Sequence, residues 1–172
     1  FECHRLQCAV NTMMGNMQAA LEHGKKAYEA VPNDPRILQQ YGEVLLKTGD
    51  TTEGCDLMVL ALEYDPIAQG QTNSDKRKSD VVFGCLLDDR PELGLKIASE
   101  ISSCSAKVVL YAATLAIDLS GSTGSYSWLI SEIQKSKKEE MIAEIEQMGK
   151  VDVVLQSKLK EVYYDKILPH CA

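Results

Sequence analysis

The feature that most constrains the fold of this chain is a spacing of 34 residues that recurs between its small residues and its prolines. Three pairs of residues are separated by this interval: Gly15 and Gly49, Ala27 and Ala61, and Pro32 and Pro66. A period of this length is typical of a unit of two helices joined by a turn, which buries its apolar faces only by stacking on its neighbours. The period therefore predicts helical hairpins that pack in series.

The small residues of the second unit indicate how its two helices meet. A glycine at position 42 lets the first helix approach the second closely, and Gly54 and Ala61 do the same from the second helix. Gly49 lies where the first helix ends in a turn that needs a positive φ. Pro66 ends the second helix, because proline cannot continue the ladder of hydrogen bonds. These residues predict a tightly packed pair of helices.

The same unit resembles a tetratricopeptide repeat. The slots of that repeat pattern hold apolar or small residues, namely Leu38, Tyr41, Gly42, Leu45, Gly54, Met58 and Pro66. The aromatic slots of the pattern are mostly aliphatic here. The resemblance covers residues 1–66 and continues in degenerate form to about residue 101. An ordinary helical hairpin of an all-α domain is the alternative interpretation.

The resemblance implies a binding scaffold with a concave groove that holds a peptide, a partner helix or another subunit. Some tetratricopeptide-repeat proteins use basic clamp residues to bind the terminal carboxylate of a peptide. Those residues are not carried over, because Gln39, Gln40 and Glu43 occupy the helix face and offer no such clamp. A structural contact within a larger assembly is therefore the preferred expectation.

The rest of the chain is predicted to be helical. Residues 76–119 form degenerate helical pairs, and residues 125–168 form the C-terminal helices. Within them, residues 106–119 are apolar on nearly every side, which is typical of a buried helix. Residues 67–80 are either an inserted loop or the start of the next helix. We predict one all-α domain over residues 1–172, with antiparallel helical pairs stacked as a short α-solenoid and a helical C-terminal part.

Charge and hydropathy limit the partners of this chain. It has 18 basic and 25 acidic residues, and the net charge of −7 argues against binding to nucleic acid or to an anionic membrane surface. No apolar run approaches the roughly 18 residues of a membrane-spanning helix. We therefore predict a soluble chain without a transmembrane segment, whose partners are other proteins.

The six cysteines do not predict a metal or redox site. They contain no CxxC pair, and Cys8, Cys55 and Cys85 are interpreted as small buried apolar residues in a reducing compartment. Cys and His are adjacent at 3–4 and again at 170–171. Neighbouring helical residues point about 100° apart and rarely reach the same metal ion. We predict no metal and no cofactor.

No group of residues predicts catalysis. The loop at 120–125 contains serine and glycine, but it lacks the lysine and the preceding strand of a phosphate-binding loop. Nothing in the spacing pairs a cysteine or serine nucleophile with a base. We therefore expect that the protein is not an enzyme and has no catalytic residues.

Four residues are candidate contacts with a partner protein: Trp128, Lys76, Arg77 and Lys78. The tryptophan is either a core anchor or an interface hot spot. The basic cluster is either a solvated stretch or a specific site for an anion or a partner.

The expected function is that of a non-enzymatic protein–protein interaction scaffold. The preferred role is an accessory or linker subunit of a large complex, which would be respiratory, ribosomal or photosynthetic if the chain is organellar. The chain begins at Phe1, so it starts after removal of a targeting peptide or inside a longer product. Its expected location is the cytoplasm or the interior of an organelle. The alternatives are a free-standing adaptor for a peptide or protein and a small-molecule carrier.

Overall fold

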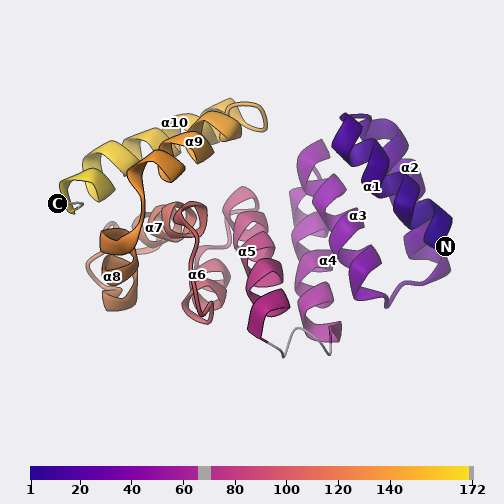
Figure 1. The fold of residues 1–172 in the computed structure, drawn as a ribbon, viewed down its shortest axis with the longest axis horizontal. Coiled ribbons are helices and arrows are strands. Elements are labelled where there is room, and N and C mark those ends of the chain that lie inside the picture. Colours follow the sequence, from indigo (N-terminus) through magenta and orange to yellow (C-terminus); the bar gives the residue numbers. More distant parts are fainter. Residues whose placement is uncertain (66–70, 171–172) are drawn as a thin grey trace. The chain divides into compact units, whose positions relative to one another are not determined.

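A computed structural model describes residues 1–65 and 71–170 of the chain (Figure 1). The described residues contain no strand and ten α-helices: α1 (Glu2–Met14), α2 (Met17–Ala30), α3 (Pro35–Thr48), α4 (Thr51–Tyr64), α5 (Gln71–Leu87), α6 (Pro91–Ser99), α7 (Ala106–Ser120), α8 (Ser127–Lys135), α9 (Lys138–Met148) and α10 (Val153–Val162). A π-helical turn (Tyr163–Ile167) and a 3₁₀ turn (Leu168–His170) follow α10. The predicted all-α fold, in which consecutive helices pack together, is confirmed.

The chain divides into two compact units. Unit 1 comprises Phe1–Asp88 and contains α1 to α5, whereas unit 2 comprises Asp89–Ala172 and contains α6 to α10. The prediction that the whole chain forms one domain is not tested by this division and stays a prediction. Among the described helices, none combines the length and the apolar character needed to cross a bilayer.

The helix ends of unit 1 follow from local sequence. Asp34 caps α3, because its carboxylate accepts a hydrogen bond from the backbone N–H of Arg36 at 2.8 Å, and Pro35 occupies the first helical position. Gly49 ends α3 with a φ of 99°, a left-handed conformation that glycine adopts without strain. The turn at Gly49 was expected from the sequence and is confirmed.

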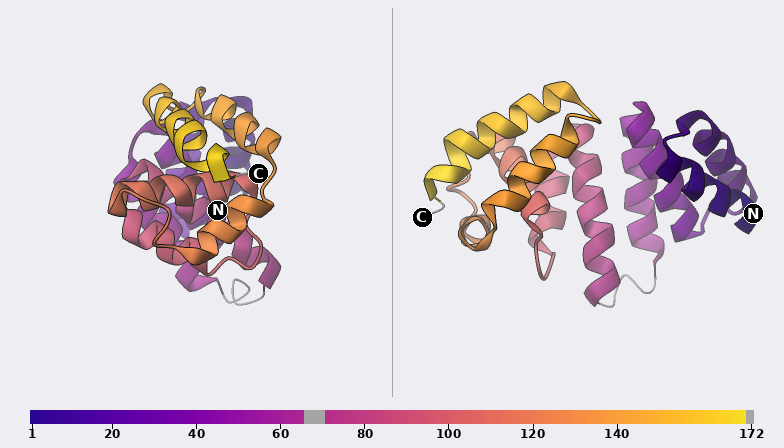
Figure 2. Two further views of the ribbon diagram at one scale, coloured as in Figure 1. Left: turned by 90° about the vertical axis from the view of Figure 1, so that its left-hand side faces the viewer. Right: turned by 45° about the horizontal axis from the view of Figure 1, so that its top comes forward.

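Unit 1 is a series of helices in which each one packs on the next (Figure 2). The closest approach is between α3 and α4. A Cβ atom added to Gly42 would lie 2.8 Å from the carbonyl oxygen of Gly54, and one added to Gly54 would lie 2.8 Å from that of Gly42. Such contacts are shorter than real Cβ atoms make, so the two glycines permit this packing. The apolar core around them includes Leu38, Tyr41, Leu45, Leu57 and Ala61.

Helix α5 begins at Gln71. Of the two interpretations of residues 67–80, the structure shows a helix from Gln71 onward, so Lys76, Arg77 and Lys78 lie on α5 and not in a loop. The predicted stop at Pro66 lies outside the described residues, and α4 itself ends at Tyr64.

Unit 2 is arranged around α7. This helix packs against α6, α8, α9 and α10, and its ten buried residues are Ala106 and the continuous run from Val108 to Ala116. The prediction of a helix buried on nearly every side is therefore confirmed. Two members of this set carry a hydroxyl group: that of Thr114 donates a hydrogen bond to the backbone carbonyl of Leu110, and that of Tyr111 donates one to the carboxylate of Glu144 on α9. Burial, followed by this hydrogen bond, raises the pKa of Tyr111.

Candidate functional site

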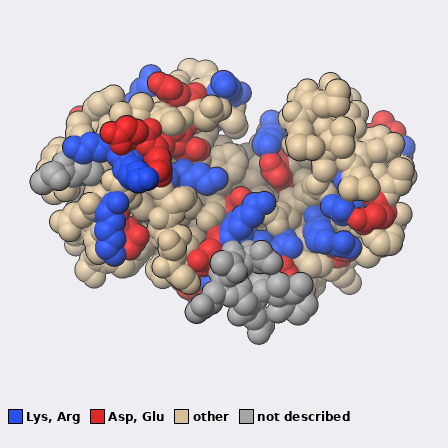
Figure 3. Space-filling view, in the orientation of Figure 1, with Lys and Arg blue, Asp and Glu red and all other residues tan. Residues whose placement is uncertain are grey.

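A polar groove on unit 1 is the best candidate for a binding site. It is lined by residues of three helices and has a volume of about 240 Å³. Its lining residues are Arg5 from α1, Arg36, Gln39, Gln40 and Glu43 from α3, and Lys76 and Arg77 from α5. We call it the α1–α3–α5 groove. On the face of unit 1 that Figure 3 shows, basic side chains lie close to one another.

The groove lining is cationic, since it contains four basic side chains and one carboxylate. Three of these four cations pair with carboxylates outside the lining. Arg5 lies 2.6 Å from Glu2, Arg36 lies 2.7 Å from Asp34, and Arg77 forms an ion pair with Asp65. The hydrogen bond from Arg5 lowers the pKa of Glu2, and the hydrogen bond from Arg36 lowers the pKa of Asp34. Both carboxylates therefore stay ionised and hold their arginines in place.

Arg77 connects α5 to α3 and to the residue that follows α4. Its guanidinium forms an ion pair with the buried carboxylate of Asp65, the residue that follows α4. It also donates hydrogen bonds to the backbone carbonyl of Pro35, at 3.2 Å, and to the side chain of Gln39. The amide of Gln39 donates in turn to Asp80 on α5. Arg77 thus positions α5 against α3 and the end of α4.

The three basic residues 76–78, which the sequence suggested as one site, have different surroundings on α5. Lys76 is exposed and lines the groove, Arg77 is held in the ion pair with Asp65, and Lys78 is half-buried. Trp128 belongs to unit 2, where it is half-buried as the second residue of α8. Their role as contacts with a partner stays a prediction.

Sequence reasoning missed two of the groove cations and one acceptor. Arg5 and Arg36 were not selected, although Arg36 precedes Gln40 by one helical turn and so shares its face. The side-chain oxygen of Gln40 is buried and makes no hydrogen bond within the described part of the protein. Residues 39, 40 and 43 carry no positive charge themselves. The cations beside them come from Arg36 and from helices that are distant in sequence.

A histidine pair joins α1 to α2. The Nδ1 atoms of His4 and His23 lie 3.0 Å apart, and the ring planes are inclined by 27°. One ring therefore donates a hydrogen bond to the other, which uses one nitrogen of each. Among the described residues, no three His, Cys, Asp or Glu side chains are grouped so that they would hold a metal ion.

Comparison with known proteins gave no further assignment. No protein-family model and no curated protein sequence matched the chain. The chemistry of the groove is therefore the basis for a functional proposal. Its lining contains guanidinium, ammonium and amide groups, which attract anions, and the carboxylate of Glu43, which repels them.

Proposed function

We propose that this protein is a non-enzymatic protein-interaction module whose α1–α3–α5 groove binds an extended acidic segment of a partner protein. The observation that carries the proposal is the excess of cations in the groove lining, on a chain whose net charge is −7. Because the whole chain is acidic, a cationic groove gives an acidic segment one favoured place to bind.

The groove chemistry favours a peptide over a simple anion. Arg5 and Arg36 use Nε and Nη2 on Glu2 and Asp34, so their Nη1 groups are the donors that a ligand would meet. The exposed ammonium group of Lys76 adds a positive charge to the same lining. Gln40 adds a side-chain amide to the lining, and an amide hydrogen-bonds to peptide groups. An extended segment with acidic side chains offers both carboxylates and peptide groups.

The resemblance of residues 1–66 to tetratricopeptide repeats supports the same proposal. That resemblance implies a concave surface that holds a peptide or a partner helix. In unit 1 the groove is formed by α1, α3 and α5, and α1 and α3 are the first helices of the two units of the repeat. The resemblance and the charge distribution thus favour the same face of unit 1.

The binding proposal is tested with a synthetic peptide. Fluorescence anisotropy of a labelled peptide of alternating Asp and Ser would measure its affinity for the intact chain, with the Asn/Ser peptide as a neutral reference. We expect Lys76→Glu to weaken binding at least about fivefold, and added salt to weaken it further.

The matched control is Lys26→Glu, an equal charge reversal on α2 outside the groove lining, and it should leave the affinity nearly unchanged. Equal losses in the two variants, or equal binding of the acidic and neutral peptides, would contradict the assignment of the groove.

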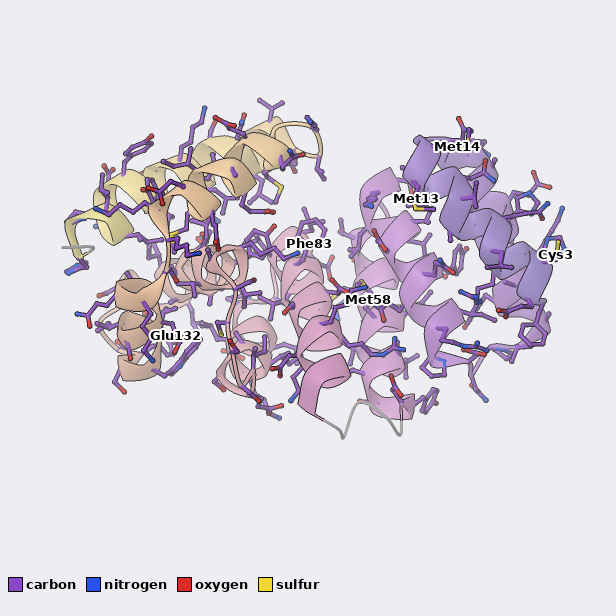
Figure 4. All side chains as sticks on the ribbon, in the orientation of Figure 1. Cys3, Met13, Met14, Met58, Phe83 and Glu132 are labelled. Carbon is purple, nitrogen blue, oxygen red and sulfur yellow. The ribbon has the colours of Figure 1, made fainter. Side chains whose placement is uncertain are left out.

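A second candidate function, a permanent accessory subunit of a large assembly, is favoured by the exposed face of α1. Leu6, Val10, Met13 and Met14 are large apolar residues with exposed fractions of 52%, 48%, 80% and 69%. Figure 4 marks Met13 and Met14 at the C-terminal end of α1. Exposed apolar patches of this kind are typical of protein interfaces. In this proposal, the protein acts in the cytoplasm or inside an organelle.

Light scattering coupled to size-exclusion chromatography separates the two functions. A stable monomer that binds the acidic peptide supports the adaptor. A chain that aggregates when isolated, and becomes monodisperse when Val10 and Met13 are changed to Glu, supports the accessory subunit.

A further inference from the structure

Two buried thiols face each other across the α4–α5 interface. The Sγ atoms of Cys55 on α4 and Cys85 on α5 lie 4.0 Å apart, and both residues are 0% exposed. Both belong to unit 1, and neither lines the groove. From the sequence they are interpreted only as small buried apolar residues, whereas their proximity also allows the two thiols to react with each other.

The two helices approach closely enough for the thiols to be joined. A Cβ atom added to Gly84, the neighbour of Cys85, would lie 3.7 Å from the Cα atom and 3.5 Å from the Sγ atom of Cys55. A disulfide needs a sulfur separation of about 2.05 Å and a Cβ separation of about 3.5–4.5 Å. The sulfurs, now 4.0 Å apart, must therefore approach each other by about 2 Å for the bond to form.

We propose that Cys55 and Cys85 are a disulfide-forming site, at which oxidation joins α4 to α5 and reduction separates them again. A small oxidant such as a peroxide reaches the thiols when the interface opens transiently. The thiolate of one cysteine attacks an oxygen of hydrogen peroxide, which breaks the O–O bond and yields a sulfenic acid and hydroxide. The second thiolate attacks the sulfenic sulfur, which forms the S–S bond and releases a second hydroxide. The two protons that the thiols lost convert both hydroxides to water. Two thiols are oxidised and one peroxide is reduced.

The disulfide would change the stability of unit 1. The cysteines are separated by 30 positions in the sequence, so the bond closes a loop that contains most of α4 and α5. Such a loop lowers the entropy of the unfolded chain and raises the midpoint of thermal unfolding. Because α5 also carries Lys76 and Arg77, the bond fixes one wall of the groove. The inference itself rests on the thiol geometry and does not depend on the proposed function.

The experiment compares the intact chain before and after treatment with hydrogen peroxide, under native conditions. The remaining thiols are then alkylated, and the protein is digested with trypsin and analysed by mass spectrometry. Cys55 lies in the tryptic peptide 48–76 and Cys85 in the peptide 79–96. We expect these two peptides to be linked and two hydrogens lighter than their sum. We also expect the unfolding midpoint to rise by about 5–15 °C and to return on reduction.

Three variants make the outcome specific. Cys55→Ala and Cys85→Ala should each abolish both the linked peptide and the rise in midpoint, whereas Cys104→Ala, a half-buried cysteine in unit 2, should keep both. Even if one variant fails to fold, the peptide map of the wild-type protein shows whether Cys55 and Cys85 are linked. The inference is wrong if both thiols remain alkylatable after oxidation, if each is oxidised separately without a link, or if the link forms only in denaturant.

Discussion

Unit 1 and unit 2 exclude water from their interiors in different ways. In unit 1, consecutive helices pack in series, and the closest contact is made at Gly42 and Gly54, where the backbones nearly touch. In unit 2, the helices surround α7, whose side chains are buried on nearly every side. Unit 1 therefore depends on an absence of side-chain atoms at a few positions, whereas unit 2 depends on filling the space around one helix.

The two units also differ in their polar interactions. In unit 1, Arg77 and Asp65 form a buried ion pair that joins α3, α4 and α5. In unit 2, the buried polar contact between the central helix and a neighbouring helix is the hydrogen bond from Tyr111 to Glu144, whereas the ion pair of Asp118 with Lys158 is partly exposed. A buried charge that loses its partner costs more free energy than a neutral group does. Unit 1 should consequently be the more sensitive of the two to single polar substitutions.

The largest expected effect is on the buried ion pair. Asp65→Ala leaves the guanidinium of Arg77 without its carboxylate and should lower the free energy of unfolding of unit 1 by about 3–5 kcal/mol. Urea denaturation followed by circular dichroism measures the loss. The double variant Asp65→Ala/Arg77→Met removes both charges and should recover part of the lost stability. A double variant as unstable as Asp65→Ala would show that the pair is not the cause.

The next effect tests the central helix of unit 2. The side chain of Leu110 is fully buried, so Leu110→Ala leaves a cavity in its place. We expect a loss of about 3 kcal/mol in the free energy of unfolding. Trp128, the only tryptophan of the chain, lies in unit 2, so its fluorescence follows the unfolding of that unit. The control is Leu119→Ala on the same helix, where the side chain is 41% exposed and the loss should be small.

A smaller effect tests the close packing of unit 1. Gly42→Ala adds a Cβ atom 2.8 Å from both the Gly54 carbonyl oxygen and the side chain of Met58, which should cost about 1–3 kcal/mol. In Gly84→Ala, the nearest atom to the new Cβ is 3.4 Å away, at the end of the flexible Leu46 side chain. This matched substitution should be neutral or stabilising, because alanine is the better helix former. Equal losses in chemical denaturation would count against close packing as the cause.

The smallest effect concerns the cap of α3. Asp34→Ala should destabilise unit 1 by about 1 kcal/mol at neutral pH. Because Arg36 lowers the pKa of Asp34 in the folded protein, the charged carboxylate adds stability above its unfolded pKa. This contribution should be lost as the pH falls below about 4. The difference in stability between wild type and Asp34→Asn, measured by denaturation across this range, should shrink toward low pH. A constant difference would contradict the role of the charge.

The sequence alone was sufficient for the parts of this protein that depend on nearby residues. Gly49 predicted the end of α3 correctly, because a helix-ending turn depends on the conformations of a few consecutive residues. The burial of α7 followed from residues 106–119, which are apolar on nearly every side of a helix. The approach of α3 to α4 followed from the repeated small residues.

Only the tertiary structure decided which polar residues meet. Arg5, Arg36 and Lys76 line one groove although they come from three helices, and no local pattern connects them. The structure likewise showed that Arg77 is held by Asp65, whereas its neighbour Lys76 is free to face the groove. The physical reason is range: helix formation and capping act within one or two turns, whereas a binding surface depends on the packing of helices that are distant in sequence.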